Sequence, residues 1–182
     1  YMISLKKNIK KKDFFYPLKD SVTGKNFNKK IKELGKYLKK NHLDIIVVTS
    51  SENIAWLLNI RGEDTMFSPI PNCFLIMDKK MNIYLFSDLK KINKDFKKKF
   101  KSIKIINKDN ISNFLRNIKD KTFSIDESTC SVYYRNIIRK QNHIKVFRDP
   151  IYLMKSLKNS VELKNTKKIH EYDGAALTKF LF

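Results

Sequence analysis

The chain has 182 residues, of which 42% are hydrophobic and 12% aromatic, which is enough for one core with an appendage and too little for two full domains. Apolar runs such as 73–77 are far shorter than the roughly 18 to 20 residues needed to cross a bilayer, so we expect no membrane association. The formal net charge of +21 makes nucleic acid, or another anionic surface, the first partner class to weigh.

The basic residues are divided unevenly between lysine and arginine. Only five of the 39 are arginines, and the lysines are scattered over several predicted elements. Nucleic-acid sites use arginine where bidentate contacts matter. We therefore interpret the excess of lysine as a compositional bias of solvated surfaces and expect no nucleic-acid partner. A stand-alone lysine-rich module that binds nucleic acid or another anion is the alternative.

Cysteine usage and the two ends of the chain give expectations about its setting. Cys73 and Cys130 are too few and too far apart for a disulfide framework, a C-x-x-C pair or a zinc knuckle, which favours a reducing, cytoplasmic location. The basic residues 1–12 are not followed by the apolar stretch of a secretory signal. The chain opens on Tyr1 and closes on Phe182 without a helix stop signal, which predicts an internal piece of a longer protein.

The first predicted elements are a linker and a helix. Residues 1–24 lack periodicity and predict an incoming linker whose aromatic residues pack on the domain. Apolar residues then recur at helical spacing over 25–41, where the lysines, Lys30 among them, are expected mostly on the solvated side. The apolar stripe consists of Phe27, Ile31, Leu34 and Leu38.

A strand, a helix and a hairpin follow. The β-branched run 45–49 is typical of a strand buried on both faces. Ser50 or Ser51 is expected to cap the next helix, in which Trp56 is predicted to lie in the core. A polar loop over 61–64 and two prolines precede a hairpin with strands at 73–77 and 83–86.

The rest of the domain alternates helices and strands. Helices are predicted at 89–99, 110–118 and 130–141, and strands at 103–106, 122–125 and 144–147. This order predicts an α/β fold, with a mixed, mostly parallel sheet flanked by helices.

The segment after Pro150 has a different character. Residues 151–157 predict a short helix, and 159–182 one uninterrupted helix that ends the chain. Twenty-four helical residues extend roughly 36 Å, more than a small α/β core covers. We therefore expect the second half of this helix to project, with Leu177, Phe180 and Leu181 exposed or held by a second copy of the chain.

Two blocks of sequence carry a family resemblance. Residues 51–64, SENIAWLLNIRGED, resemble the D-x-I-A-W-L-L-N-x-R-G-x-D stretch in the second domain of three-domain Xaa-Pro aminopeptidases, the aminopeptidase P family. Residues 154–181 resemble the K-A-x-K-N-x-x-E … H-x-x-D-G-A-A-L-x-x-F-L pattern that opens the catalytic domain of that family. Thr166 and Ile169 depart from the pattern, where the family commonly has Met and a small residue. The resemblance covers about 20–182.

The resemblance implies a domain organisation. Residues 1–24 would be the incoming linker, 25–158 a creatinase/prolidase N-terminal-like α/β domain, and 159–182 the first helix of a truncated "pita-bread" metallopeptidase domain. The partners implied are that catalytic domain of the same parent chain, proline-containing peptides for the full enzyme, and a second copy in a homodimer.

The resemblance also implies an activity for the parent protein. Such enzymes are cytosolic and remove the first residue from peptides with proline in second position. Two Asp, a His and two Glu hold a pair of divalent metals, usually manganese, in the catalytic domain. None of these ligands can be assigned to this chain, so no catalytic or metal-binding residue is expected. A degenerate family member that acts by pairing with another chain is a second alternative.

One loop is a candidate for an interdomain or substrate-proximal role. Arg61 follows an apolar helix, and Gly62 frees the backbone, so the guanidinium could reach a neighbouring domain or a peptide carboxylate. The structural alternative is that Arg61 pairs with Asp64 or Glu63 and fixes the loop. The candidate site residues are therefore Arg61 and Asp64.

Overall fold

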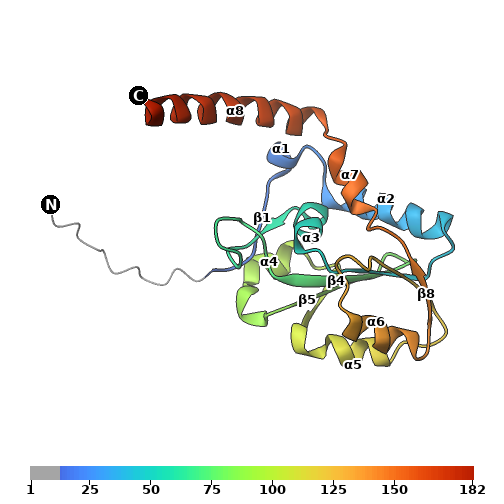
Figure 1. Ribbon diagram of the computed structural model, residues 1–182. Coiled ribbons are helices and arrows are strands. Elements are labelled where there is room, and N and C mark those ends of the chain that lie inside the picture. The colour runs from blue at the N-terminus through green and yellow to red at the C-terminus, as the bar shows by residue number, and fades with distance from the viewer. Residues whose placement is uncertain (1–12) are drawn as a thin grey trace.

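The computed structural model describes residues 13–182, and its centre is a six-stranded sheet (Figure 1). The strands run in the order β6-β5-β4-β2-β7-β8. Their bounds are β2 Ile45–Val48, β4 Cys73–Asp78, β5 Ile83–Ser87, β6 Ile103–Asn107, β7 Thr122–Ile125 and β8 His143–Val146.

The pairing of the strands is mixed. The pairs β2–β7, β5–β6 and β7–β8 are parallel, whereas β2–β4 and the hairpin β4–β5 are antiparallel. The predicted α/β class with a mixed, mostly parallel sheet is confirmed, and each predicted strand is present to within two residues.

Helices cover both faces of the sheet (Figure 1). The alternating side chains of β2 explain why: Ile46 and Val48 join one buried cluster, Ile45 and Val47 the other. The first cluster is covered by α2 Phe27–Lys40, α3 Ser51–Leu58 and α4 Lys94–Lys99, and the second by α5 Ile111–Arg116 and α6 Val132–Arg139.

Three local expectations need correction. The helix predicted at 89–99 is a 3-10 turn, η1 Leu89–Lys91, followed by α4. Ser50 occupies the N-cap of α3, but neither it nor Ser51 caps the helix through its side chain, and the Ser51 hydroxyl donates to the Cys73 carbonyl oxygen (3.3 Å). Trp56 is half-buried at the rim of the first cluster and not inside it.

The described part of the incoming segment packs on the domain. Strand β1, Tyr16–Pro17, pairs with β3, Ile60–Arg61, and the short helix α1, Asp20–Thr23, follows. The Phe15 side chain is 1% exposed, and its ring meets that of Phe96 edge-on, with 6.2 Å between centroids.

Two helices complete the chain. Helix α7, Ile151–Ser156, rests on α3, and α8, Ser160–Leu181, leads away from the sheet above α1 (Figure 1). The predicted projection is confirmed, because Leu177, Phe180 and Leu181 are 59%, 84% and 69% exposed. Among the described residues, no helix combines the length and apolarity that spanning a membrane requires.

Candidate functional site

The two candidate site residues do not pair with each other. The Arg61 guanidinium turns back onto the end of α3, where Nη1 donates to the carbonyl oxygens of Ala55 (3.3 Å) and Ile60 (2.8 Å). Burial lowers the pKa of Arg61. The Asp64 carboxylate instead pairs with Lys91 Nζ (2.8 Å) and accepts from the Asn72 amide (2.8 Å). The loop is thus fixed by a lysine that sequence spacing did not indicate.

Two apolar side chains of the loop that follows Asp64 are exposed to solvent. Met66 and Phe67 are 78% and 98% exposed, and Phe67 has a positive φ of 62°. The turn is closed by the Ser68 amide, which donates to the Thr65 carbonyl oxygen (3.3 Å).

The two sequence blocks that carry the resemblance meet in space. Trp56 Nε1 donates to Glu162 Oε1 (3.1 Å). Lys155 Nζ donates to Asn53 Oδ1 (2.9 Å) and lies 3.5 Å from Glu52 Oε2. These contacts fasten the start of α8, and α7 before it, to helix α3. We call the set Lys30, Trp56, Asn59, Asn159 and Glu162 the junction cluster.

The first turn of α8 is held from both sides. Asn159 and Glu162 form a capping box, in which the Glu162 carboxylate accepts from the Asn159 amide (2.9 Å). Asn159 Nδ2 also donates to the Thr23 carbonyl oxygen (2.9 Å), which joins α8 to α1. Gly24, with φ 66°, permits this approach, because a Cβ there would lie 2.2 Å from Asn159 Oδ1.

Lys30 lies at the centre of the junction cluster and is 1% exposed, contrary to the expectation that it is solvated. Its Nζ donates to the Trp56 carbonyl oxygen and to Asn59 Oδ1, both at 2.7 Å, and lies 3.8 Å from the centroid of the Trp56 ring. Burial lowers the pKa of Lys30 to about 8, against an opposing influence of the Glu162 carboxylate. In the described chain it has no carboxylate within 4 Å, so carbonyl oxygens and an aromatic face hold the ammonium.

A second buried connection fixes the approach to α7. Asp149 is 6% exposed and accepts from Asn53 Nδ2 (2.7 Å) and from the Ile151 amide (2.9 Å). Burial raises the pKa of this carboxyl group. Asp126 Oδ2 in turn accepts from the Asp149 amide (2.8 Å), which ties the end of β7 to the same corner.

Sequence reasoning missed most of the junction cluster, although two signals were present. Lys30 falls three residues after Phe27 and four before Leu34, which is the spacing of the apolar stripe itself. Asn159 and Glu162 have the spacing of a capping box. Neither signal predicts the distant partner. Asn59, the partner of Lys30, lies 29 residues away, and Trp56, the partner of Glu162, lies 106 residues away.

A catalytic metal pair is held by a cluster of His, Asp and Glu side chains. Within 13–182, no three His, Cys, Asp or Glu side chains gather in a way that could hold a metal ion. His42, His143 and His170 are all exposed. What the junction cluster can do is mechanical: it fixes the direction in which α8 leaves the domain.

Comparisons with known proteins place these features in context. The Creatinase/Prolidase N-terminal domain family model matches residues 7–162. Xaa-Pro aminopeptidase 1 of Dictyostelium discoideum is 34% identical over 173 residues, which is 93% of this chain and 27% of that protein. A probable Xaa-Pro aminopeptidase P of Laccaria bicolor is 27% identical, with 25% of its length covered. The chain thus spans about a quarter of the curated relatives it matches.

Solved structures share the fold. An X-prolyl aminopeptidase from Caenorhabditis elegans, described as a cytosolic enzyme with a di-nuclear active site, superposes with a TM-score of 0.84 at 24% identity. The match covers 93% of this chain and 29% of that one. The prolidase from Pyrococcus horikoshii OT3 gives a TM-score of 0.57 at 16% identity, over 83% of this chain and 42% of that one.

Proposed function

Since this chain belongs to the creatinase/prolidase N-terminal domain family, we propose that it is a non-catalytic domain of an Xaa-Pro aminopeptidase, the second of its creatinase-like domains, joined to the start of the catalytic domain. Its role is to hold and orient the catalytic domain and to form part of the approach to the cleft. The parent protein removes the first residue from peptides with proline in second position.

The observation that carries this proposal is the state of α8. Its first turn is fixed by the capping box and by the hydrogen bond from Trp56. From Ile169 onward, in contrast, the large apolar side chains of α8 are exposed to solvent. A helix whose apolar residues lack a partner needs one to bury them. The arrangement supports a boundary near 159, with 159–182 as the first helix of the catalytic domain. The division of the rest into an incoming linker, 1–24, and a domain, 25–158, stays a prediction, and within that linker Phe15 is already buried in the first cluster.

The cofactors and setting of the parent follow from the same proposal. Two divalent metals, with manganese the expected ion, would be held by the downstream pita-bread domain and would supply metal-assisted hydrolysis there. The C. elegans neighbour, described as cytosolic and di-nuclear, supports a cytoplasmic metallopeptidase. A homodimer and proline-containing peptides complete the proposed partners. Arg61 and Asp64 are engaged within the chain, so we propose that the Met66–Phe67 turn that follows them is the part of this loop that faces the catalytic domain or its substrate.

A domain exchange tests the proposal. The matching segment of the Dictyostelium enzyme is replaced by this chain, and hydrolysis of an Xaa-Pro peptide is measured with manganese. We expect the chimera to retain at least a tenth of the parental kcat/KM, and a version that lacks the segment to lose activity. A chimera that melts cooperatively and binds its metals but does not turn over would refute the proposed role.

A further inference from the structure

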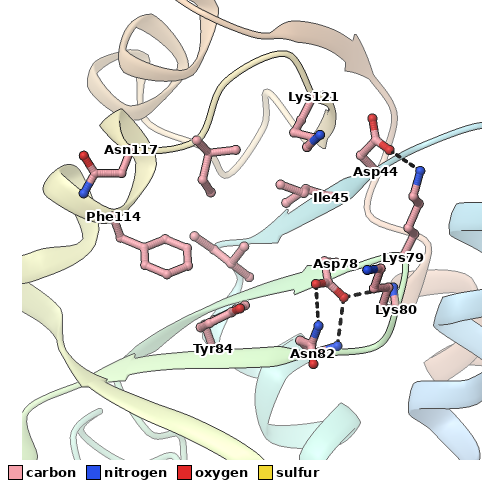
Figure 2. A pocket seen from close by; sticks show the side chains of 12 residues that line it. Asp44, Ile45, Asp78, Lys79, Lys80, Asn82, Tyr84, Phe114, Asn117 and Lys121 are labelled. Carbon is pink, nitrogen blue, oxygen red and sulfur yellow. Dashed lines mark hydrogen bonds and ion pairs between the residues drawn. The ribbon is translucent and has the colours of Figure 1, made fainter.

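A cavity lies on the face of the sheet covered by α5, between that helix and the β4–β5 hairpin (Figure 2). Its volume is about 660 Å³, within the range of roughly 300 to 1,000 Å³ typical of small-molecule sites. The junction cluster lies on the other side of the sheet, among the residues of the first buried cluster. The cavity therefore has no part in holding α8.

The wall of the cavity is apolar and aromatic. The rings of Tyr84 and Phe114 face the hollow from a strand and from α5, with centroids 4.7 Å apart (Figure 2). Ile45, Ile76 and Ile118 complete this wall. Ile45 and Ile76 are nearly fully buried, while Tyr84, Phe114 and Ile118 are half-buried and keep part of their surface open to the cavity. A flat apolar group is the shape that such a wall accommodates best.

The acidic groups at the rim are already engaged. Asp44 pairs with Lys79 Nζ (2.7 Å) and accepts from the Thr122 amide (2.9 Å), so its pKa is lowered, first by the hydrogen bond from Lys79. Asp78 accepts from the Lys80 and Asn82 amides (2.9 Å each) and from Asn82 Nδ2 (2.7 Å) (Figure 2). Asp44 is thus paired with a cation, whereas Asp78 accepts only from neutral amide groups and keeps its negative charge.

Two of the three lysines that line the cavity form no ion pair among the described residues. Lys80 and Lys121 line the cavity and have no carboxylate within 4 Å in the described part of the chain. Lys104 adds a third cation beside the wall, with its Nζ 5.3 Å from the centroid of the Tyr84 ring. The lining therefore has three lysines against two carboxylates, and with Lys104 beside it the site has a net positive charge next to an apolar and aromatic wall.

We propose that this cavity binds a small aromatic anion, with its ring against Tyr84 and Phe114 and its carboxylate or sulfonate directed to Lys80 and Lys121. The inference goes beyond the scaffold role and requires no catalytic domain. The apolar wall excludes a fully hydrated inorganic anion as the preferred ligand, and the rim charge disfavours a cation.

The test uses naphthalene-2-carboxylate as probe and its neutral isostere, 2-naphthamide, as matched ligand. Binding is followed by ¹H–¹⁵N correlation spectra of the whole chain. We expect saturable shifts of the Ile45, Ile118 and Lys121 amides, with a Kd on the order of 1 mM or tighter, as an open site and a ligand of this size allow. The amide should bind at least threefold more weakly, because it lacks the charge.

Variants separate this site from the general positive charge of the protein. Changing Lys80 and Lys121 together to Gln should raise the Kd about fivefold, as the loss of two exposed ion pairs predicts. The control removes the same charge from α2 with Lys36→Gln and Lys39→Gln and should leave the Kd within twofold. Asn117→Trp, at an exposed cap that lines the cavity, should abolish binding by filling it.

Three results would overturn the proposal. The first is no saturable shift at these amides up to 10 mM probe, about ten times the expected Kd. The second is equal weakening by the control pair, which would show binding to the lysine surface at large. The third is unchanged affinity in a folded Asn117→Trp variant.

Discussion

Trp56 and Glu162, 106 residues apart, are joined by a hydrogen bond of 3.1 Å from the indole Nε1 to the carboxylate Oε1. Each belongs to one of the two sequence blocks that resemble Xaa-Pro aminopeptidases. The same carboxylate closes the capping box of α8 through its other oxygen. One acidic side chain therefore both starts the last helix and attaches it to the domain.

Trp56→Phe removes the indole donor and keeps most of the ring. We expect a loss of about 1 kcal/mol in unfolding free energy, typical of one hydrogen bond. Hydrogen exchange of amides 161–165 should become several times faster. Tyr172→Phe, on the exposed part of α8, is the control and should change neither quantity. Unchanged exchange in Trp56→Phe would mean that the indole does not hold α8.

Lys30→Met tests the buried ammonium through pH. The pKa of Lys30 is lowered from 10.5 to about 8, so between these values the unfolded chain holds a proton that the folded chain has released. This group therefore adds stability as pH rises from 8 to 10.5, by up to about 3 kcal/mol. The measurement is urea unfolding of both proteins across that range. The difference between them isolates Lys30 from other groups, such as Cys73, whose pKa burial raises.

We expect the unfolding free energy of the wild type to rise relative to that of Lys30→Met as the pH increases from 8 to 10.5. A difference that stays flat, in a variant that folds cooperatively, would place the Lys30 ammonium in contact with water.

Gly24→Ala tests the close approach of α1 and α8. The added Cβ would lie 2.2 Å from Asn159 Oδ1 and 2.7 Å from Val161 Cβ, at a backbone φ of 66°. We expect the unfolding free energy to fall by about 1–3 kcal/mol, since alanine disfavours the positive φ and its Cβ would clash with α8. Gly174→Ala is the matched control, because a Cβ there meets nothing within 4 Å. It should be neutral or stabilise α8 by up to about 1 kcal/mol. Equal effects at both glycines would contradict the packing described.

The second half of α8 should be poorly protected in a monomer. We expect residues 172–182 to exchange at close to the rate of an isolated helix, because their side chains are exposed and bury nothing. Hydrogen exchange with the oligomeric state measured in parallel checks this. Strong protection in a proven monomer would show that the segment belongs to the core of this domain.

The chain alone should not hydrolyse an Xaa-Pro peptide when manganese is added. Metal-assisted hydrolysis needs a held metal, and residues 13–182 present no cluster of ligands for one. The assay is release of the first residue over a day, with an intact Xaa-Pro aminopeptidase as positive control. Turnover that co-elutes with this chain on two columns would contradict our assignment of the chemistry to another domain.

Sequence determined the six strands of the main sheet, most of the helices and the two faces of that sheet. The run Ile45–Val48 predicted a strand buried on both sides, and its alternate residues do enter two separate clusters. The apolar stripe of α2 and the short helix after Pro150 were equally local, because each depends on residues within one or two turns of the chain. The alternation of strands and helices predicted the α/β class in the same way, and the two family motifs predicted which α/β domain it is.

Tertiary structure alone decided which polar groups meet. Arg61 and Asp64 are three residues apart and do not pair. Asp64 forms an ion pair with Lys91, and the Arg61 guanidinium donates to carbonyl oxygens at the end of α3. Lys30 looks like any other lysine of α2 until Trp56 and Asn59 enclose it. A periodic pattern records which face of an element is apolar, but a hydrogen bond or ion pair depends on a second element whose position the pattern does not contain.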